Sequence, residues 1–180
     1  MSILKVSRLG NPVLRMKTQP LTKEALAGPT IQTLIDNMVE TMADYHGVGL
    51  AANQVHESLS IAVIESHGPR GDIPMTVLVN PDITVLDEGL AEDWEGCLSI
   101  PDLRGRVPRY RRLRVDALDR HGHKIDFIAE DLFARVVQHE FDHLMGMVYL
   151  DRMRDFQTLT HFGEFQRYWQ PHETKEESSS

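Results

Sequence analysis

Two histidines in this sequence are spaced for binding a metal ion. His139 and His143 are the ends of the stretch His139-Glu140-Phe141-Asp142-His143. Positions four apart share one face of a helix, so both imidazoles can reach the same ion. Glu140 would lie on an adjoining, mostly apolar flank, where an unpaired carboxylate is costly to bury. The pattern therefore predicts a metal site in which Glu140 is the general base beside a water molecule.

A catalytic site of this type needs a third protein ligand, and the sequence offers two candidates. Glu164 lies downstream of the histidines. Cys97, the single cysteine, is chemically better, because a thiolate binds Zn²⁺ and Fe²⁺ strongly. Its neighbours favour this role, since Gly96 allows close approach of the backbone and Glu95 can accept a hydrogen bond from an imidazole N–H. The alternatives are an inert buried cysteine and a helix whose histidines bind nothing.

Two helices are expected from the spacing of the apolar residues. The first covers residues 30–42 and stops at Gly47. The second covers residues 130–144 and stops at Gly146, with acidic residues where a helix N-terminus favours them. Its inward face would carry the two histidines, and the residues expected to project the other way are Arg135, Gln138 and Asp142.

The segments between the two helices read as strands. Short runs rich in β-branched residues cover 60–65, 75–80, 83–86, 113–119 and 124–129, and a turn signal at 120–123 joins the last two as a hairpin. Hairpins in place of regular βαβ crossovers favour an α+β fold. We expect one domain of mixed antiparallel β-sheets packed around the central metal-binding helix, with an N-terminal helix. It would cover residues 1–170, followed by a polar, disordered tail at 171–180.

Composition excludes several classes of function. The chain has 180 residues, of which 41% are hydrophobic, enough for one domain with a core. Its 27 acidic and 19 basic residues give a net charge of −8, which disfavours charge-driven binding to nucleic acid. No apolar run approaches the roughly 20 residues that span a membrane, and the first residues do not resemble a targeting segment. We therefore expect a cytoplasmic protein without membrane contact or sequence-specific nucleic-acid binding.

Arginines and aromatic residues form two further clusters. Six of the fourteen arginines lie between Arg104 and Arg114, which predicts a solvated loop leading into a strand; the alternative is a docking patch for the ribosome or an acidic partner. After Asp151 the chain carries aromatic residues that predict packing onto the domain or a partner. They are Phe156, Phe162, Phe165, Tyr168 and Trp169.

Three stretches together resemble the signature motifs of the peptide deformylase family. They are Gly47–Gln54, Glu95–Ser99 and Gln138–His143, which occur in the family's order and at similar spacings. The resemblance covers roughly residues 3–153. It implies removal of the formyl group from the N-terminal formyl-methionine of newly synthesised polypeptides, with release of formate. The same resemblance implies a metallohydrolase that acts on a linear amide.

The resemblance also implies a role for each candidate site residue. Cys97, His139 and His143 would hold one divalent metal, usually Fe²⁺, with Zn²⁺, Ni²⁺ or Co²⁺ able to replace it. Glu140 would be the acid and base, and the oxyanion would be stabilised by the Leu98 backbone N–H and the Gln54 side-chain amide. The substrate would lie as an extended strand beside Val48, Gly49 and Gly96, and its methionine in a pocket of Val48, Leu132 and Val136.

Other interpretations of the same residues remain open. Leu132 and Val136 are ordinary core residues on composition alone, and Gln54 is a surface amide in the simplest interpretation. Another metal-dependent amidase or peptidase with the same histidine motif is the alternative enzyme. A non-catalytic, metal-stabilised module at the ribosome is the alternative from a different class. A transient ribosome contact would use the arginines, because the segment after Asp151 lacks the basic character of the family's C-terminal helix.

Overall fold

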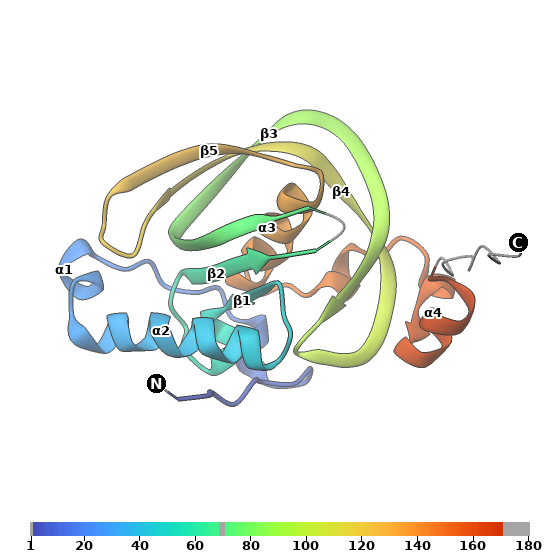
Figure 1. Cartoon of the computed structure of the whole chain (residues 1–180), viewed down its shortest axis with the longest axis horizontal. Coiled ribbons are helices and arrows are strands. Elements are labelled where there is room, and N and C mark those ends of the chain that lie inside the picture. The colour runs from blue at the N-terminus through green and yellow to red at the C-terminus, as the bar shows by residue number, and fades with distance from the viewer. Residues whose placement is uncertain (1, 69–70, 171–180) are drawn as a thin grey trace, which may run out of the picture.

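An antiparallel sheet curves around one central helix, α3 (Asp131–Leu144), in the computed structural model (Figure 1). The structure describes residues 2–68 and 71–170. Within this part of the chain the strand order is β1-β2-β3-β4-β5, and β6 pairs with β4. The strands are β1 (Gly49–Ala51), β2 (Ile61–Ser66), β3 (Ile73–Cys97), β4 (Ile100–Leu118), β5 (Lys124–Glu130) and β6 (Thr160–His161). The predicted α+β class is confirmed, whereas the predicted tail at 171–180 lies outside the described residues.

The remaining helices lie at the two ends of the chain (Figure 1). They are α1 (Lys23–Leu26), α2 (Pro29–Asp44) and α4 (Phe162–Tyr168), with 3₁₀ turns at Pro12–Arg15, Ala52–Val55, Tyr149–Arg152 and Phe156–Thr158. Helix α2 is the predicted N-terminal helix, and it buries Ile35, Met38 and Met42 in a cluster with residues of β1 and β2. Its stop is not Gly47, since His46 takes the left-handed conformation at φ 54°.

The strands in the middle of the chain are longer than the sequence predicts. Residues 75–80 and 83–86 belong to one strand, β3, which continues to Cys97. A register shift between Val79 and Asp82, with Asn80 at φ 50°, absorbs the Pro81-Asp82 break. Such bulges bend a strand without ending it, which lets the β3–β4 hairpin arch around α3 (Figure 1).

The arginine-rich segment was predicted as a loop, and this prediction is wrong. Residues 104–114 lie inside β4, paired with β3 along most of their length. Alternate residues of this segment are buried, including Val107, Arg109 and Leu113. Burial of every second residue is the pattern of a strand with one covered face. The many arginines in this segment interrupt the alternation of apolar and polar residues, so the sequence alone did not indicate a strand.

Helix α3 begins and ends as predicted, at Asp131 and before Gly146, which has φ 78°. Arg135, Gln138 and Asp142 lie on the side of the helix away from the histidines, yet they are only 7%, 6% and 3% exposed. The curved sheet covers this side as well, so α3 is enclosed almost completely. The helix that carries both histidines therefore has little exposed surface.

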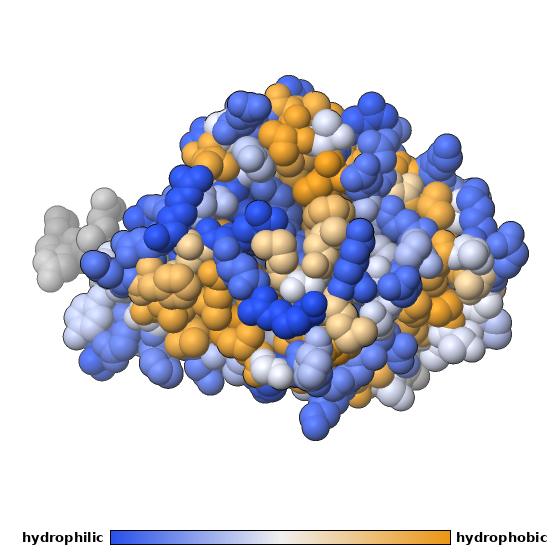
Figure 2. Space-filling model, turned by 180° about the vertical axis from the view of Figure 1, so that it is seen from behind, coloured by the Kyte–Doolittle hydropathy of each residue, from blue (hydrophilic) through white to orange (hydrophobic). Residues whose placement is uncertain are grey.

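The surface is divided among hydrophobic patches and hydrophilic residues. Figure 2 shows several such patches on the back of the molecule, separated by hydrophilic side chains. None of the described helices combines the length and the apolarity that a membrane crossing needs.

Candidate metal centre

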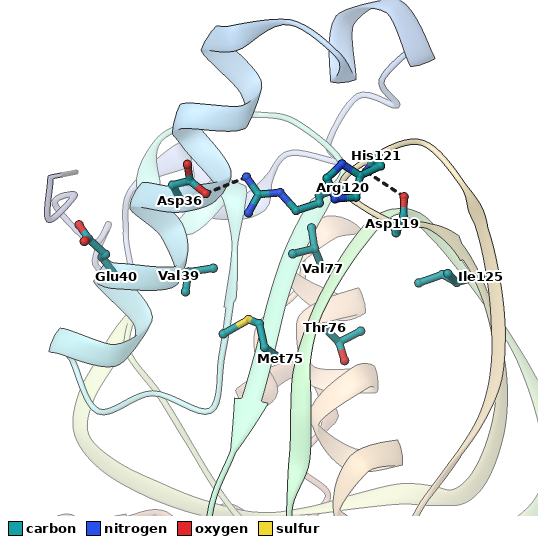
Figure 3. Close-up of a pocket in the computed structure, with 10 residues that line it drawn as sticks. All are labelled: Asp36, Val39, Glu40, Met75, Thr76, Val77, Asp119, Arg120, His121 and Ile125. Carbon is teal, nitrogen blue, oxygen red and sulfur yellow. Dashed lines mark hydrogen bonds and ion pairs between the residues drawn. The ribbon is translucent and has the colours of Figure 1, made fainter.

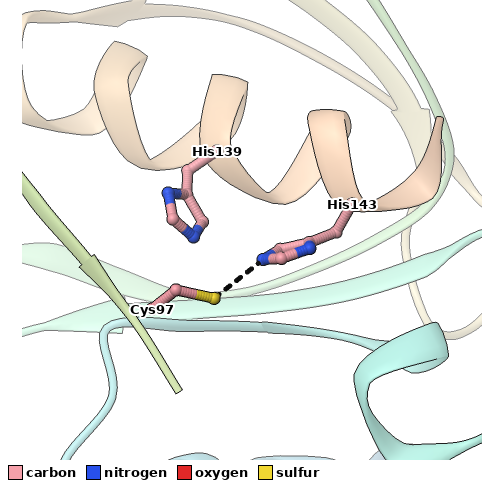
Figure 4. Close-up of side chains that lie close together, drawn as sticks. All are labelled: Cys97, His139 and His143. Atoms are coloured by element: carbon pink, nitrogen blue, oxygen red, sulfur yellow. Dashed lines mark hydrogen bonds between the residues drawn. The ribbon is translucent and has the colours of Figure 1, made fainter. Parts of the chain in front are cut away.

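The end of β3 and one face of α3 bring three metal-binding side chains together. Cys97 is the last residue of β3, directly before the two-residue turn to β4, and His139 and His143 project from α3 (Figure 4). The Sγ atom of Cys97 lies 3.2 Å from Nε2 of His143. One ligand atom from each of the three residues lies within 4.8 Å of the others. Glu164, the alternative third ligand, is exposed on α4 and does not belong to this group.

The charges of these three side chains suit a divalent cation. Burial raises the pKa of the Cys97 thiol, but the imidazoles of His143 and His139 outweigh this effect and hold that pKa well below its usual range. The two imidazoles therefore favour the thiolate form of Cys97. One thiolate with two imidazoles is a donor set suited to Zn²⁺ or Fe²⁺. The residues present thus fit the metal that the sequence predicted.

Glu95 fixes the orientation of His139. Its Oε2 accepts a hydrogen bond of 2.9 Å from Nδ1 of His139, as the position of Glu95 before Cys97 led us to expect. With Nδ1 occupied in this way, Nε2 is the nitrogen left for a metal ion. Burial lowers the pKa of His139, while Cys97 and Glu95 raise it by more, so the net shift is upward.

Glu140 is buried next to the same group of ligands. Its burial raises its pKa, and its Oε2 atom has no hydrogen-bond partner among the described residues. The other oxygen lies so close to Gly49 that a Cβ atom there would be 2.3 Å from Oε1. Gly49 is therefore required to admit the Glu140 carboxylate, a reason that the sequence did not show.

Gln54 points into the site and is not a surface amide. It lies in the 3₁₀ turn after β1 and is 1% exposed. Its Oε1 accepts a hydrogen bond from the Ala51 N–H, which leaves Nε2 facing Cys97 Sγ at 3.5 Å and Ser99 Oγ at 3.1 Å. Leu98 follows Cys97 in the β3–β4 turn, so its backbone N–H belongs to the peptide bond that directly follows the cysteine.

The predicted substrate residues lie in three different environments. Val48 is exposed directly before β1, and Gly49 begins that strand. Gly96 precedes Cys97 in β3. Val136 is buried in a core cluster, and Leu132 packs against this cluster, so both have the contacts of core residues.

A network of charged residues supports the centre, and local sequence patterns did not predict it. Arg109, expected on a solvated surface, is buried and binds both oxygens of Glu95, at 2.9 and 3.0 Å. It also donates to Asp142 at 2.5 Å. Arg135 donates to Glu95 at 2.8 Å, and Arg152 donates to Asp142 at 2.7 Å. Glu95 therefore connects His139 to a rigid scaffold of ion pairs.

Replacing Arg109 by leucine is expected to lower the free energy of unfolding by about 3–5 kcal/mol, because the change leaves Glu95 and Asp142 short of a buried partner. Urea denaturation of the metal-free protein measures this loss. Arg112→Leu is the matched control, since the pair of Arg112 with Glu130 is exposed and is expected to be worth less than about 1 kcal/mol. Equal losses in the two variants would contradict the structural role of Arg109.

A separate hollow of about 590 Å³ lies between α2, β3 and the β4–β5 turn. Val39, Met75 and Val77 contribute apolar surface, and an ion pair of 2.7 Å between Arg120 and Asp36 borders it (Figure 3). No residue of the metal centre lines this hollow. It has no part in the chemistry considered below.

This α+β domain places two histidines, a cysteine and a buried carboxyl group around one site. That combination is typical of a metal-dependent hydrolase. Comparison with known proteins then gives its family. A family model described as polypeptide deformylase matches residues 3–158, and the chain belongs to this family. Its function is the removal of the N-formyl group from nascent polypeptides. The resemblance found in the sequence is confirmed. The family assignment therefore replaces the two alternatives, another metal-dependent amidase or peptidase and a non-catalytic module at the ribosome.

Individual relatives agree with this assignment. Peptide deformylase 2 of Ralstonia nicotianae is 43% identical over 164 residues, which cover 88% of this chain and 85% of the relative. Peptide deformylase 1 of Nitrosomonas europaea is 44% identical over 159 residues, with 85% and 89% covered. The crystal structure of the class I type b peptide deformylase from Acinetobacter baumannii bound to K3U has a TM-score of 0.82 at 33% identity, covering 85% of this chain and 100% of that one.

Proposed function

We propose that Cys97, His139 and His143 hold one Fe²⁺ ion, at which the formyl group of an N-formyl-methionyl polypeptide is hydrolysed to formate. The convergence of a thiolate and two imidazoles beside the Glu140 carboxylate supports this proposal. When bound, a divalent ion supplies Lewis-acid chemistry and lowers the pKa of water. Zn²⁺, Ni²⁺ and Co²⁺ are the other ions that this donor set would accept.

In this proposal Glu140 moves the proton. Water adds to the formyl carbon, Glu140 accepts its proton, and the same proton passes to the amine nitrogen as the C–N bond breaks. A carboxyl group whose pKa is raised by burial is suited to both steps near neutral pH. The Leu98 N–H and Nε2 of Gln54, which here donates to Ser99 Oγ and Cys97 Sγ, would donate to the oxyanion that forms on the former formyl oxygen.

The substrate is proposed to bind between two strand edges. Strand β1 ends the sheet order, and β2 pairs with β3 only as far as Val79. The backbone of Val48 and Gly49 on one side, and of Gly96 on the other, can therefore pair with an extended peptide. The methionine side chain would enter a pocket of Val48, Leu132 and Val136.

The rest of the proposal concerns the setting of the reaction. The catalytic domain spans residues 1–170 and acts in the cytoplasm on nascent chains. A transient contact with the ribosome would use exposed arginines of β4 such as Arg111. The pairing of neighbouring arginines with carboxylates reduces the net positive charge there, so the contact is expected to be brief. These pairs are Arg106 with Glu92, Arg112 with Glu130 and Arg114 with Asp116.

The test is a direct assay of the reaction. Protein loaded with Fe²⁺ under anaerobic conditions is expected to release formate from formyl-Met-Ala-Ser, measured with a coupled formate dehydrogenase. Acetyl-Met-Ala-Ser is the control, and mass spectrometry is expected to show no cleavage of either peptide backbone. Backbone cleavage without formate would instead indicate a peptidase and refute the proposal.

A further inference from the structure

The C-terminal segment returns to the metal-binding end of the β3–β4 hairpin (Figure 1). There β4 leaves its regular pairing with β3, because the register shifts between Glu95 and Cys97. At this shift β4 pairs instead with β6, through Leu103 with His161 and Arg104 with Thr160. Helix α4 follows β6 directly, so it is held beside the strand that ends in Cys97.

Aromatic rings join α4 to this strand. Phe165 meets Trp94 edge to face at a centroid distance of 5.0 Å, and Trp169 lies 5.5 Å from the same ring. Phe162, the first residue of α4, lies under the guanidinium group of Arg104, whose Cζ is 4.5 Å from the ring centroid. The predicted packing of the C-terminal aromatic residues onto the domain is confirmed for these three.

Arg104 in turn covers Gly96. A Cβ atom on Gly96 would lie 2.2 Å from Nη1 of Arg104, so the guanidinium group rests directly on the glycine backbone. This is the strand edge to which we assign the substrate. The ring of Phe162 thus lies behind a cation that borders the proposed peptide site.

Strand alternation determines what a bound peptide would meet here. Glu95 and Cys97 point inward to the metal centre, so Gly96 and Trp94 face the side on which α4 lies. A peptide residue paired opposite Gly96 would turn its side chain to that same side. Phe162 and Trp169 offer it apolar surface, because they are 36% and 54% exposed.

We propose that β6 and α4 form an outer wall of the substrate site. Phe162 is a positioning residue that holds Arg104 over Gly96, and the exposed rings of Phe162 and Trp169 bind an apolar side chain within the two residues after the methionine. The preferred substrates are thus formyl-methionyl chains with a bulky apolar residue at one of these positions. This inference rests on the proposed function, since it needs the peptide strand along Gly96.

The test compares steady-state kinetics of the Fe²⁺-loaded full chain on formyl-Met-Ala-Ser, formyl-Met-Phe-Ser and formyl-Met-Ala-Phe. The wild type is expected to show a KM about 5- to 10-fold lower for at least one phenylalanine peptide than for formyl-Met-Ala-Ser. Phe162→Ala is expected to abolish this difference by raising KM, with kcat changed less than about twofold and metal content unchanged. Phe162→Tyr retains the aromatic face, so this variant is expected to keep the preference for the phenylalanine peptides. The milder Phe162→Leu is expected to keep it only in part.

Phe156→Ala is the matched control, because Phe156 belongs to the same segment but is 61% exposed and outside this ring cluster. It is expected to behave as the wild type. Equal KM values for the three peptides in the wild type, or an unchanged preference in Phe162→Ala and Phe162→Leu, would overturn the inference while leaving deformylation intact. A fall in kcat alone, equal for all peptides, would also overturn it, since only a structural role would remain. Absence of formate release from every peptide would instead refute the proposed function, and the wall would lose its basis.

Discussion

Glu140→Gln is expected to lower kcat for formyl-Met-Ala-Ser by about a thousandfold, within the range that general acid–base groups contribute. Glutamine has nearly the same shape, so it fits the space that Gly49 leaves beside the carboxylate. It accepts no proton from water and delivers none to the amine. The expected loss therefore isolates proton transfer from packing. Formate release under anaerobic conditions measures it.

Metal content separates this effect from damage to the centre. Glu140→Gln and Glu140→Ala are both expected to retain metal, as determined by elemental mass spectrometry after gel filtration. Glu57→Gln, a change at an exposed glutamate, is the control for handling and is expected to keep full activity. Full activity in either Glu140 variant would eliminate the proposed mechanism.

Cys97→Ala is expected to weaken metal binding by more than about 100-fold, because residues that merely orient a ligand already contribute 10- to 100-fold. The substitution removes the anionic member of the ligand set, whose pKa the neighbouring imidazoles keep low. Competition with a chromogenic chelator measures the affinity, and deformylase activity is expected to disappear with the metal.

The folded state of the variant has to be checked with the same sample. Circular dichroism of metal-free Cys97→Ala is expected to match that of the metal-free wild type, since alanine only shortens a buried side chain. Unchanged affinity in a folded variant would remove the cysteine from the ligand set. Glu164→Ala is the matched comparison, and we expect its affinity to equal that of the wild type.

The parts of the structure that the sequence predicted depend on local spacing. The bounds of α3 and the shared face of its two histidines follow from positions a few residues apart. Helical periodicity is visible in a short window, so these features are readable without knowledge of the partner strands.

The features that the sequence did not predict depend on pairing between distant segments. Arg109 is buried because Glu95 and Asp142, 14 and 33 positions away, both meet it. Nothing near Arg109 in the chain distinguishes it from its exposed neighbours except the alternation of burial along β4. The functions of Gly49 and Gly96 were incompletely predicted for the same reason, since Glu140 and Arg104 reach them only in the folded chain.

The three candidate metal ligands come from a strand and a helix that are far apart in the sequence, and this has a consequence for folding. Cys97 is the last residue of β3, His143 lies 46 positions later in the last turn of α3, and the sheet curves around that helix. A bound ion would therefore act as a cross-link that closes a long loop of the chain, and its affinity would add to the stability of the whole domain. Loss of the ion would then remove the link between β3 and α3 and also stop the reaction. The stability of the folded enzyme and its catalytic activity would therefore be lost together.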